Sequence, residues 1–278
     1  IGLIVLTYIP LIAVFGLSFF KWGGTGAPEW NGINNYIKLF TTDPYFKESI
    51  KVTVYFSLLA VVGSMVYSLI VAMLLNRKIP ARGFFRAVFY LPYVLPAAAV
   101  YIGWSWLYNT EWGLFNYILS KLGIERLMFV SSSSQVVPSL ALIAVWLSGN
   151  LIVIFLAGLQ NVPRVYHEAA EIDGANAWQR FWHVTFPSMT PIIFYNMLMS
   201  LITNMQVVTP ALALTKGGPG KSSYFMSYML YNYAFKQRGK IGLACAIAFV
   251  LFLLIGAFTL LLFATSKSWI FYEGGDDK

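Results

Sequence analysis

Charged residues are scarce in this sequence. Asp, Glu, Lys and Arg make up only 11% of its 278 residues, whereas soluble domains carry roughly 25%. A deficit of this size excludes an ordinary water-soluble enzyme. The net charge of +8 raises the question of nucleic acid. However, the basic residues lie in short loops between apolar runs and form no single stripe, so we do not expect nucleic-acid binding.

Residues that commonly build catalytic or metal sites are also few. The single Cys245 lies inside an apolar run, which excludes an internal disulfide and indicates a small buried hydrophobe. His167 and His183 have no Cys or His partners at ligand spacing, so no metal site is expected. A phosphate-binding loop ending at Gly220 would need glycine where Thr215 stands. No Ser/His/Asp set is identifiable, and we expect no catalytic site and no cofactor in this chain.

Long apolar runs dominate instead: the sequence is 58% hydrophobic, with a mean hydropathy of +0.67. Six runs approach or exceed the roughly 20 residues that cross a hydrocarbon core, and none contains Asp, Glu, Lys, Arg or His. They are residues 1–20, 52–75, 87–106, 137–159, 188–209 and 241–263. Backbone groups in lipid must bond to each other, so all six are predicted to be α-helices. The sequence thus predicts an all-α integral membrane protein with one transmembrane domain, residues 1–278.

The start of the chain and the loop charges bear on orientation. Residues 1–20 lack a basic leading region and a cleavage site, so we expect a span, preceded by residues outside this sequence. Alternation places both termini and the loops at 76–86 and 160–187 on one side. The whole-loop charge count disagrees, with eleven Lys and Arg outside and eight inside. The short, acid-free cluster at 77–86 lies directly beside two spans and favours a cytoplasmic location.

Polar side chains at membrane depth are uncharged and concentrate in the fifth span. Ion- and proton-coupled carriers use ionisable groups within their membrane spans. The spans of this chain have no such groups, which indicates that energy for transport comes from outside the chain. One helical face carries the candidate pathway residues Asn196, Ser200, Thr203, Asn204 and Gln206. Such a face could hydrogen-bond a neutral polyhydroxylated solute or only its neighbouring helices. Rings could come from Tyr101, Trp104, Trp106 and Tyr108, although an aromatic belt is the simpler interpretation.

Small residues recur every four positions in two spans, as helix packing in membranes requires. The second span has Ala60, Ser64, Ser68 and Ala72; the sixth has Gly242 with Ala246 and Ala244 with Ala248. Packing within the chain is the first interpretation, and a subunit interface is the alternative.

The loop at 160–187 is polar yet favours helices. Pro163 suits a first helical turn, and Asp173-Gly174 indicates a stop with a positive φ. Asn176, followed by Gln179, is typical of the cap of a second helix, which we expect to end before Pro187. The acidic residues would be repelled by anionic lipid, so the predicted helix-turn-helix is expected to face a protein.

The spacing in this loop resembles a known family. Glu168-Ala169-Ala170, then Gly174, then Val184-Thr185-Phe186-Pro187, is similar to the "EAA" loop of membrane subunits of binding-protein-dependent ABC importers. That family usually has Ile in place of Val184 and Leu in place of Phe186. Residues 82–92, 112–116 and 214–219 resemble the maltose/glycerol-phosphate branch, and its first permease in particular.

This resemblance implies a type I importer permease in a bacterial or archaeal cell membrane, with cytoplasmic termini. It implies a second permease subunit, two ATPase subunits that bind ATP and Mg, and an extracytoplasmic sugar-binding protein. The loop would be the coupling helix pair seated in the ATPase. Its residues would be Val165, Glu168, Ala169, Ala170, Ile172, Asp173, Gly174 and Pro187.

In the family pattern, Glu168 would pair with a basic ATPase residue and Gly174 would make the turn. Ala169 and Ala170 would allow close approach, while Val165 and Ile172 would pack into the cleft. The expected function is ATP-driven carbohydrate import by alternating access. A permease for a non-sugar solute, a secondary carrier and a membrane scaffold are the alternatives.

Overall fold

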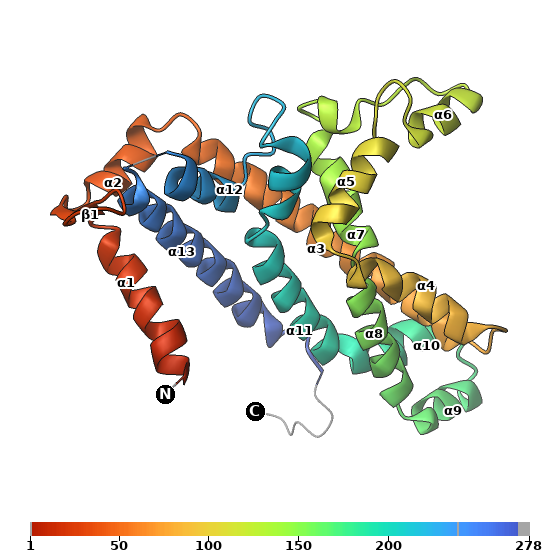
Figure 1. Ribbon diagram of the computed structural model, residues 1–278. Helices are drawn as coiled ribbons and strands as arrows, with labels where there is room; N and C mark the ends of the chain where they lie inside the picture. The colour runs from red at the N-terminus through yellow and green to blue at the C-terminus, as the bar shows by residue number, and fades with distance from the viewer. Residues whose placement is uncertain (1, 238, 272–278) are drawn as a thin grey trace.

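The computed structural model describes residues 2–237 and 239–271, and almost all of its regular structure is helical (Figure 1). The α-helices are α1 Ile9–Leu17, α2 Asn34–Ile37, α3 Phe46–Asn76, α4 Arg82–Val94, α5 Ala97–Leu107, α6 Leu114–Lys121, α7 Val136–Trp146, α8 Gly149–Asn161, α9 Arg164–Ile172, α10 Ala177–Arg180, α11 Phe186–Met205, α12 Met226–Tyr231 and α13 Ile241–Ser266. A 3₁₀ turn, Phe129–Ser131, and π-type turns at Ile4–Tyr8, Lys38–Thr42, Phe181–Thr185, Ala211–Thr215 and Asn232–Lys236 link or extend them. The strands β1 Phe20–Lys21 and β2 Glu29–Trp30 pair antiparallel.

Helices α3 and α13 are continuous and contain the predicted spans 52–75 and 241–263. Both are long and apolar enough to cross a membrane. The predicted span 188–209 corresponds to α11, which ends at Met205, so its last residues lie outside the helix. The predicted span 1–20 is shorter than expected, because the helical conformation ends at Leu17 and Phe20 already pairs with Trp30.

The other two predicted spans are bent pairs, so the expectation of a single helix at 87–106 and at 137–159 is wrong. Helices α4 and α5 meet at 100°, and α7 and α8 at 50°. Pro96 explains the first bend, since a residue before proline avoids the helical region and Leu95 has ψ 143°. The second has no proline. There Gly149 lies so close to α4 that an added Cβ would sit 2.6 Å from the Phe89 carbonyl oxygen.

Helix α3 runs diagonally through the molecule, and α7, α8 and α11 pack on it (Figure 1). The stripe of Ala60, Ser64, Ser68 and Ala72 is buried along its length. The Ser68 and Ser148 hydroxyl oxygens lie 2.9 Å apart across the contact. Small residues therefore serve packing within this chain, as the first interpretation predicted.

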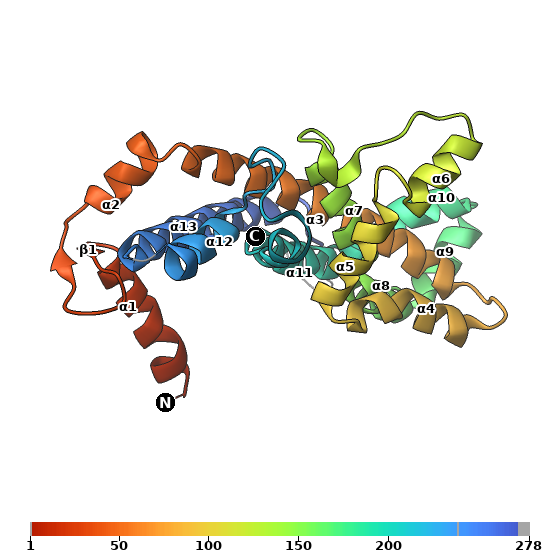
Figure 2. The ribbon, with the colours of Figure 1, turned by 45° about the horizontal axis from the view of Figure 1, so that its top comes forward.

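Helix α13 packs by the same device near its start, where a Cβ on Gly242 would lie 1.9 Å from the Phe20 carbonyl oxygen. Helix α1 packs against α13 and lies away from the rest of the bundle in both views (Figures 1 and 2). Helices α9 and α10 lie at one end of the molecule, and β1 and α2 lie at the other. The amphipathic helix α6 caps the α5 side.

Candidate functional site

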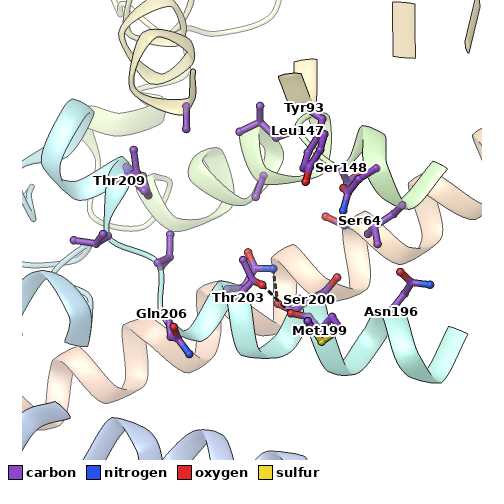
Figure 3. A pocket seen from close by; sticks show the side chains of 18 of the residues that line it. Ser64, Tyr93, Leu147, Ser148, Asn196, Met199, Ser200, Thr203, Gln206 and Thr209 are labelled. Atoms are coloured by element: carbon purple, nitrogen blue, oxygen red, sulfur yellow. Dashed lines mark hydrogen bonds between the residues drawn. The ribbon is translucent and has the colours of Figure 1, made fainter. Parts of the chain in front are cut away.

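A cavity of about 590 Å³ opens between α11, the α4–α5 bend and the α7–α8 bend (Figure 3). All five candidate pathway residues of the fifth span line it. They are Asn196, Ser200, Thr203, Asn204 and Gln206. No Asp, Glu, Lys, Arg or His side chain is among its lining residues. The five residues expected from the sequence therefore form one wall of this cavity, while whether they contact a solute stays a prediction.

Three polar side chains of α11 donate hydrogen bonds to backbone carbonyls of their own helix. Asn196 Nδ2 donates to the Ile192 carbonyl and Asn204 Nδ2 to the Ser200 carbonyl, both at 2.8 Å. The Thr203 hydroxyl donates to the Met199 carbonyl at 2.9 Å. An amide keeps an acceptor oxygen and a second N–H, and a hydroxyl keeps its lone pairs. The face therefore offers uncharged acceptors and donors, which suits a ligand bearing hydroxyl groups.

Tyrosines supply the aromatic part of the lining. Tyr93, Tyr101 and Tyr195 line the cavity, and of these only Tyr101 was a candidate from sequence. The 100° bend at Pro96 brings Tyr93 and Tyr101, on opposite sides of it, to one cavity. A straight helix at 87–106 could not predict this. Ser64, Ser148, Asn150 and Thr209 complete the polar lining and were not candidates from the sequence, in which Ser64 was interpreted as a packing residue.

The remaining aromatic candidates of the third span are not part of this lining. Trp104 packs against Tyr108, Phe115 and Trp146 with ring centroids 5.1–5.7 Å apart. Trp106 is exposed. Their simpler interpretation, aromatic packing and an outer belt, fits the structure.

The loop at 160–187 forms the predicted helix-turn-helix. Helix α9 ends in a Schellman motif: the Gly174 N–H donates to the Glu171 carbonyl and the Ala175 N–H to the Ala170 carbonyl. Gly174 has φ +78°, which favours glycine. Asn176 and Gln179 then form a reciprocal capping box on α10. These local signals determine the shape of the turn.

Apolar side chains on this loop are exposed, although they are large. Val165 is 67% exposed, Ile172 86% and Trp178 69%. Glu168 and Ala169 are also exposed, as is Asp173, whereas Ala170 is half-buried. Between the two helices, the Arg180 guanidinium forms an ion pair with the Glu171 carboxylate. The loop is therefore braced internally and presents an uncovered apolar surface.

The prediction that the second helix ends before Pro187 is wrong. Helix α10, the π-type turn Phe181–Thr185 and α11 form one continuous helical run. In the π-type turn the Phe186 N–H donates to the Phe181 carbonyl, five residues back. The wider turn accommodates the proline that follows, which has no N–H and would crowd an ordinary α-turn. Pro187 is half-buried in the first turn of α11.

The Gly-Gly-Pro segment is the other loop that the sequence singles out. This segment contains two turns, in which the Gly218 N–H donates to the Thr215 carbonyl and the Ser222 N–H to the Pro219 carbonyl, as expected for a Gly-Gly-Pro sequence. Within residues 2–237 and 239–271, no three His, Cys, Asp or Glu side chains gather in a way that could hold a metal ion.

Comparison with known proteins adds family evidence. The family described as "Binding-protein-dependent transport system inner membrane component" matches residues 64–268. The probable ABC transporter permease protein YesP of Bacillus subtilis is 36% identical over all of this chain and 90% of its own length. The multiple sugar-binding transport system permease protein MsmF of Streptococcus mutans is 36% identical, covering 96% and 91%. The trehalose/maltose permease protein MalF of Thermococcus litoralis is 30% identical, covering 92% and 87%.

Solved structures support the fold. A chain of a bacterial ABC transporter involved in alginate import superposes with a TM-score of 0.81 at 20% identity, covering 96% of this chain and 91% of its own. A second, from the alginate transporter in complex with a periplasmic protein that carries an alginate pentasaccharide, also gives 0.81, at 19% identity, covering 96% and 90%.

Proposed function

Since the chain belongs to the family of inner membrane components of binding-protein-dependent transport systems, we propose that it is one transmembrane half of an ATP-driven carbohydrate importer. It is a multi-pass membrane protein. The relatives named for multiple sugars and for trehalose and maltose support a sugar substrate. The observation that carries the proposal is the cavity at α11, whose lining combines neutral hydrogen-bonding groups with tyrosines and has no charged side chain.

The cavity chemistry favours a neutral sugar over an ion or a charged solute. Sugar hydroxyls both donate and accept hydrogen bonds, as the amide and hydroxyl groups of the cavity lining do. Tyrosine rings offer apolar faces to the C–H faces of a sugar ring. A charged solute would call for charged partners at this depth, where an unpaired charge is costly. In this proposal Asn196, Ser200, Thr203, Asn204 and Gln206 form one wall of the sugar pathway.

The partners follow from the same family. A second permease subunit would complete the pathway, two ATPase subunits would bind ATP and Mg, and a sugar-binding protein would deliver the substrate. A periplasmic partner of this kind is present in the alginate structure. The exposed apolar residues Val165 and Ile172 and the turn at Gly174 support a role of the 160–187 loop as the ATPase-coupling element. This chain itself would hydrolyse no ATP.

The same arrangement supports cytoplasmic termini. The start of α1, the end of α13 and the helices α9 and α10 all lie along the lower side of Figure 1. If the coupling loop meets a cytoplasmic ATPase, the start of α1 and the end of α13 lie on the cytoplasmic side.

The test is uptake of labelled sugar by proteoliposomes that contain the whole importer complex and its binding protein. Replacing Asn204 with Leu removes hydrogen-bonding groups worth about 0.5–1.5 kcal/mol each, so KM should rise about twofold to tenfold. Thr203→Val tests a neighbouring position. Thr265→Val is the matched control, because the Thr265 hydroxyl also bonds to its own helix but lies near the end of α13, outside this cavity.

Two results would contradict the proposal. Unchanged uptake kinetics and substrate range in both cavity variants would remove these residues from the pathway. Purification of the chain without any ATPase or second permease would contradict the importer assembly.

A further inference from the structure

The turn between α3 and α4, residues 76–86, is called the basic turn here. It holds Arg77, Lys78, Arg82 and Arg86 and no acidic residue. It lies at the same end of the molecule as α9 and α10 in both ribbon views (Figures 1 and 2). Across the described part of the chain, the ion pairs found use other side chains. Four positive charges therefore stand together without an acidic partner in the described structure.

The two arginines of α4 differ in what they bond. Arg82 donates from Nε to the Leu75 carbonyl at 2.6 Å and from Nη2 to the Asn76 carbonyl at 2.5 Å, and so it closes the end of α3. Arg86 Nε is buried and has no hydrogen-bond partner among the residues described. That nitrogen is out of reach of a ligand, but the two terminal nitrogens of Arg86 are not buried in this way and make no hydrogen bond within the described residues, so they are the donors that an outside acceptor would meet. Guanidinium groups match phosphate oxygens in a two-point contact.

An uncovered apolar stripe continues from the basic turn along α4. Phe84, Val88 and Leu91 follow helical spacing, and Phe84 is 67% exposed. The space at Gly83 is open, with no atom within 4 Å of an added Cβ, so a ligand has access to the first turn of α4. The first turns of α4 thus carry basic side chains, and the exposed face that follows is apolar.

We propose that the basic turn and the first turns of α4 bind the headgroup phosphate of an anionic phospholipid whose acyl chains lie along Phe84, Val88 and Leu91. Charge complementarity favours an anionic headgroup, and each basic residue near an anionic bilayer surface adds to the attraction. An acidic patch of a water-soluble protein would fit the cations as well. It would not cover a stripe that runs on from the basic turn along an apolar membrane segment. A second permease subunit would bring apolar helix faces to the stripe, whereas a phospholipid brings an anion to the cations and hydrocarbon to the stripe together, so the lipid is the occupant that we propose.

The test measures lipid retained by the purified importer complex. The complex is equilibrated in detergent with equal amounts of phosphatidylglycerol and phosphatidylcholine, and bound lipid is counted by native mass spectrometry. Wild type should retain phosphatidylglycerol preferentially. Arg86→Gln should lower that retention about fivefold, and Arg77→Gln with Lys78→Gln should lower it by at least as much. Arg86→Lys should keep much of it, since the charge remains.

Lys121→Gln is the matched control. Lys121 is an exposed cation at the end of α6, on the opposite side of the molecule, and its loss should leave retention unchanged. The proposal is overturned if wild type retains both lipids equally, or if Lys121→Gln lowers retention as much as Arg86→Gln. It is also overturned if the basic-turn variants release an ATPase subunit while phosphatidylglycerol retention stays constant, since a protein would then occupy the turn. If Arg86→Gln fails to fold, the Arg77/Lys78 variant, which leaves α4 intact, decides the question.

Discussion

The loop at 160–187 and the basic turn at 76–86 lie at one end of the molecule and differ in almost every local property. The first carries three acidic residues within α9 and its following turn, a Schellman motif and a capping box. The second carries four cations and no acid, and α4 begins at Arg82, where the N-cap residue Ala81 gives no side-chain cap. In the first loop, hydrogen bonds and an ion pair join residues of the loop to each other. In the second, the Arg86 guanidinium makes no hydrogen bond within the described residues. Two loops on one side of a membrane protein can therefore be built for partners of opposite chemistry.

The largest expected effect is on ATPase binding, and it comes from removing exposed apolar area at the tip of the 160–187 loop. Burial of a side chain such as Ile172 contributes about 1.5–3 kcal/mol, so Ile172→Ser should weaken ATPase retention by tenfold or more. Copurification of the ATPase at rising salt and dilution measures this. Ile124→Ser is the control, because Ile124 is the same apolar residue type, is 50% exposed and follows α6, outside the 160–187 loop. Full ATPase retention by Ile172→Ser would show that the tip is not buried by that subunit.

The second-largest effect is expected from a change to the backbone of the turn at Gly174. Gly174 has φ +78°, and a β-branched residue there costs about 1–2 kcal/mol, which lowers the population of the native turn by roughly fivefold to thirtyfold. Gly174→Val should reduce sugar uptake while membrane insertion stays normal. Gly123→Val is a matched control, with φ +72° and open space around it after α6. Equal loss of uptake in both variants would make strain, and not coupling, the cause.

The ion pair between Glu171 and Arg180 should have a smaller effect. Glu171 lies largely exposed, and exposed pairs contribute about 0.2–1 kcal/mol. Arg180→Gln should loosen the contact between α9 and α10 and lower coupled ATP hydrolysis modestly. The exchanged pair, Glu171→Arg with Arg180→Glu, should restore part of it. A double-mutant cycle on hydrolysis rates measures the coupling, and zero interaction energy would show that the brace is not formed.

The smallest expected effect is that of ionic strength, which should weaken binding at the basic turn more than binding at the 160–187 loop. Raising ionic strength from 0.1 to 1 M shortens the Debye length from about 10 to about 3 Å. Phosphatidylglycerol retention at the basic turn should fall, while ATPase retention through the apolar tip should change little. Parallel losses of lipid and ATPase across a salt series would remove the distinction.

The coupling turn was predictable because its signals are local. Asp173-Gly174 and Asn176 with Gln179 act within a few residues, so spacing alone determined the caps. The two bends were harder. Pro96 was visible in the sequence, but the second bend depends on Gly149 fitting against the Phe89 carbonyl, a contact between distant segments.

The cavity was predictable on one side only. The α11 wall was found because uncharged polar residues recur on one helical face. Tyr93 and Tyr195 were missed, since a tyrosine in an apolar run is also typical of the membrane interface. Pro187 misled for a related reason: proline usually ends a helix, but a π-type turn allows it to stand inside a continuous one.

That uninterrupted helix has a mechanical consequence. The capping box at Asn176 and the cavity residues Thr203 and Asn204 belong to one rod, hydrogen-bonded from α10 through the π-type turn to the end of α11. In the proposed coupling, a displacement of α10 would reach the cavity wall through continuous helix, with no loop between them. The 160–187 loop and the cavity wall are therefore joined by one continuous helical run that includes the wide turn at 181–185.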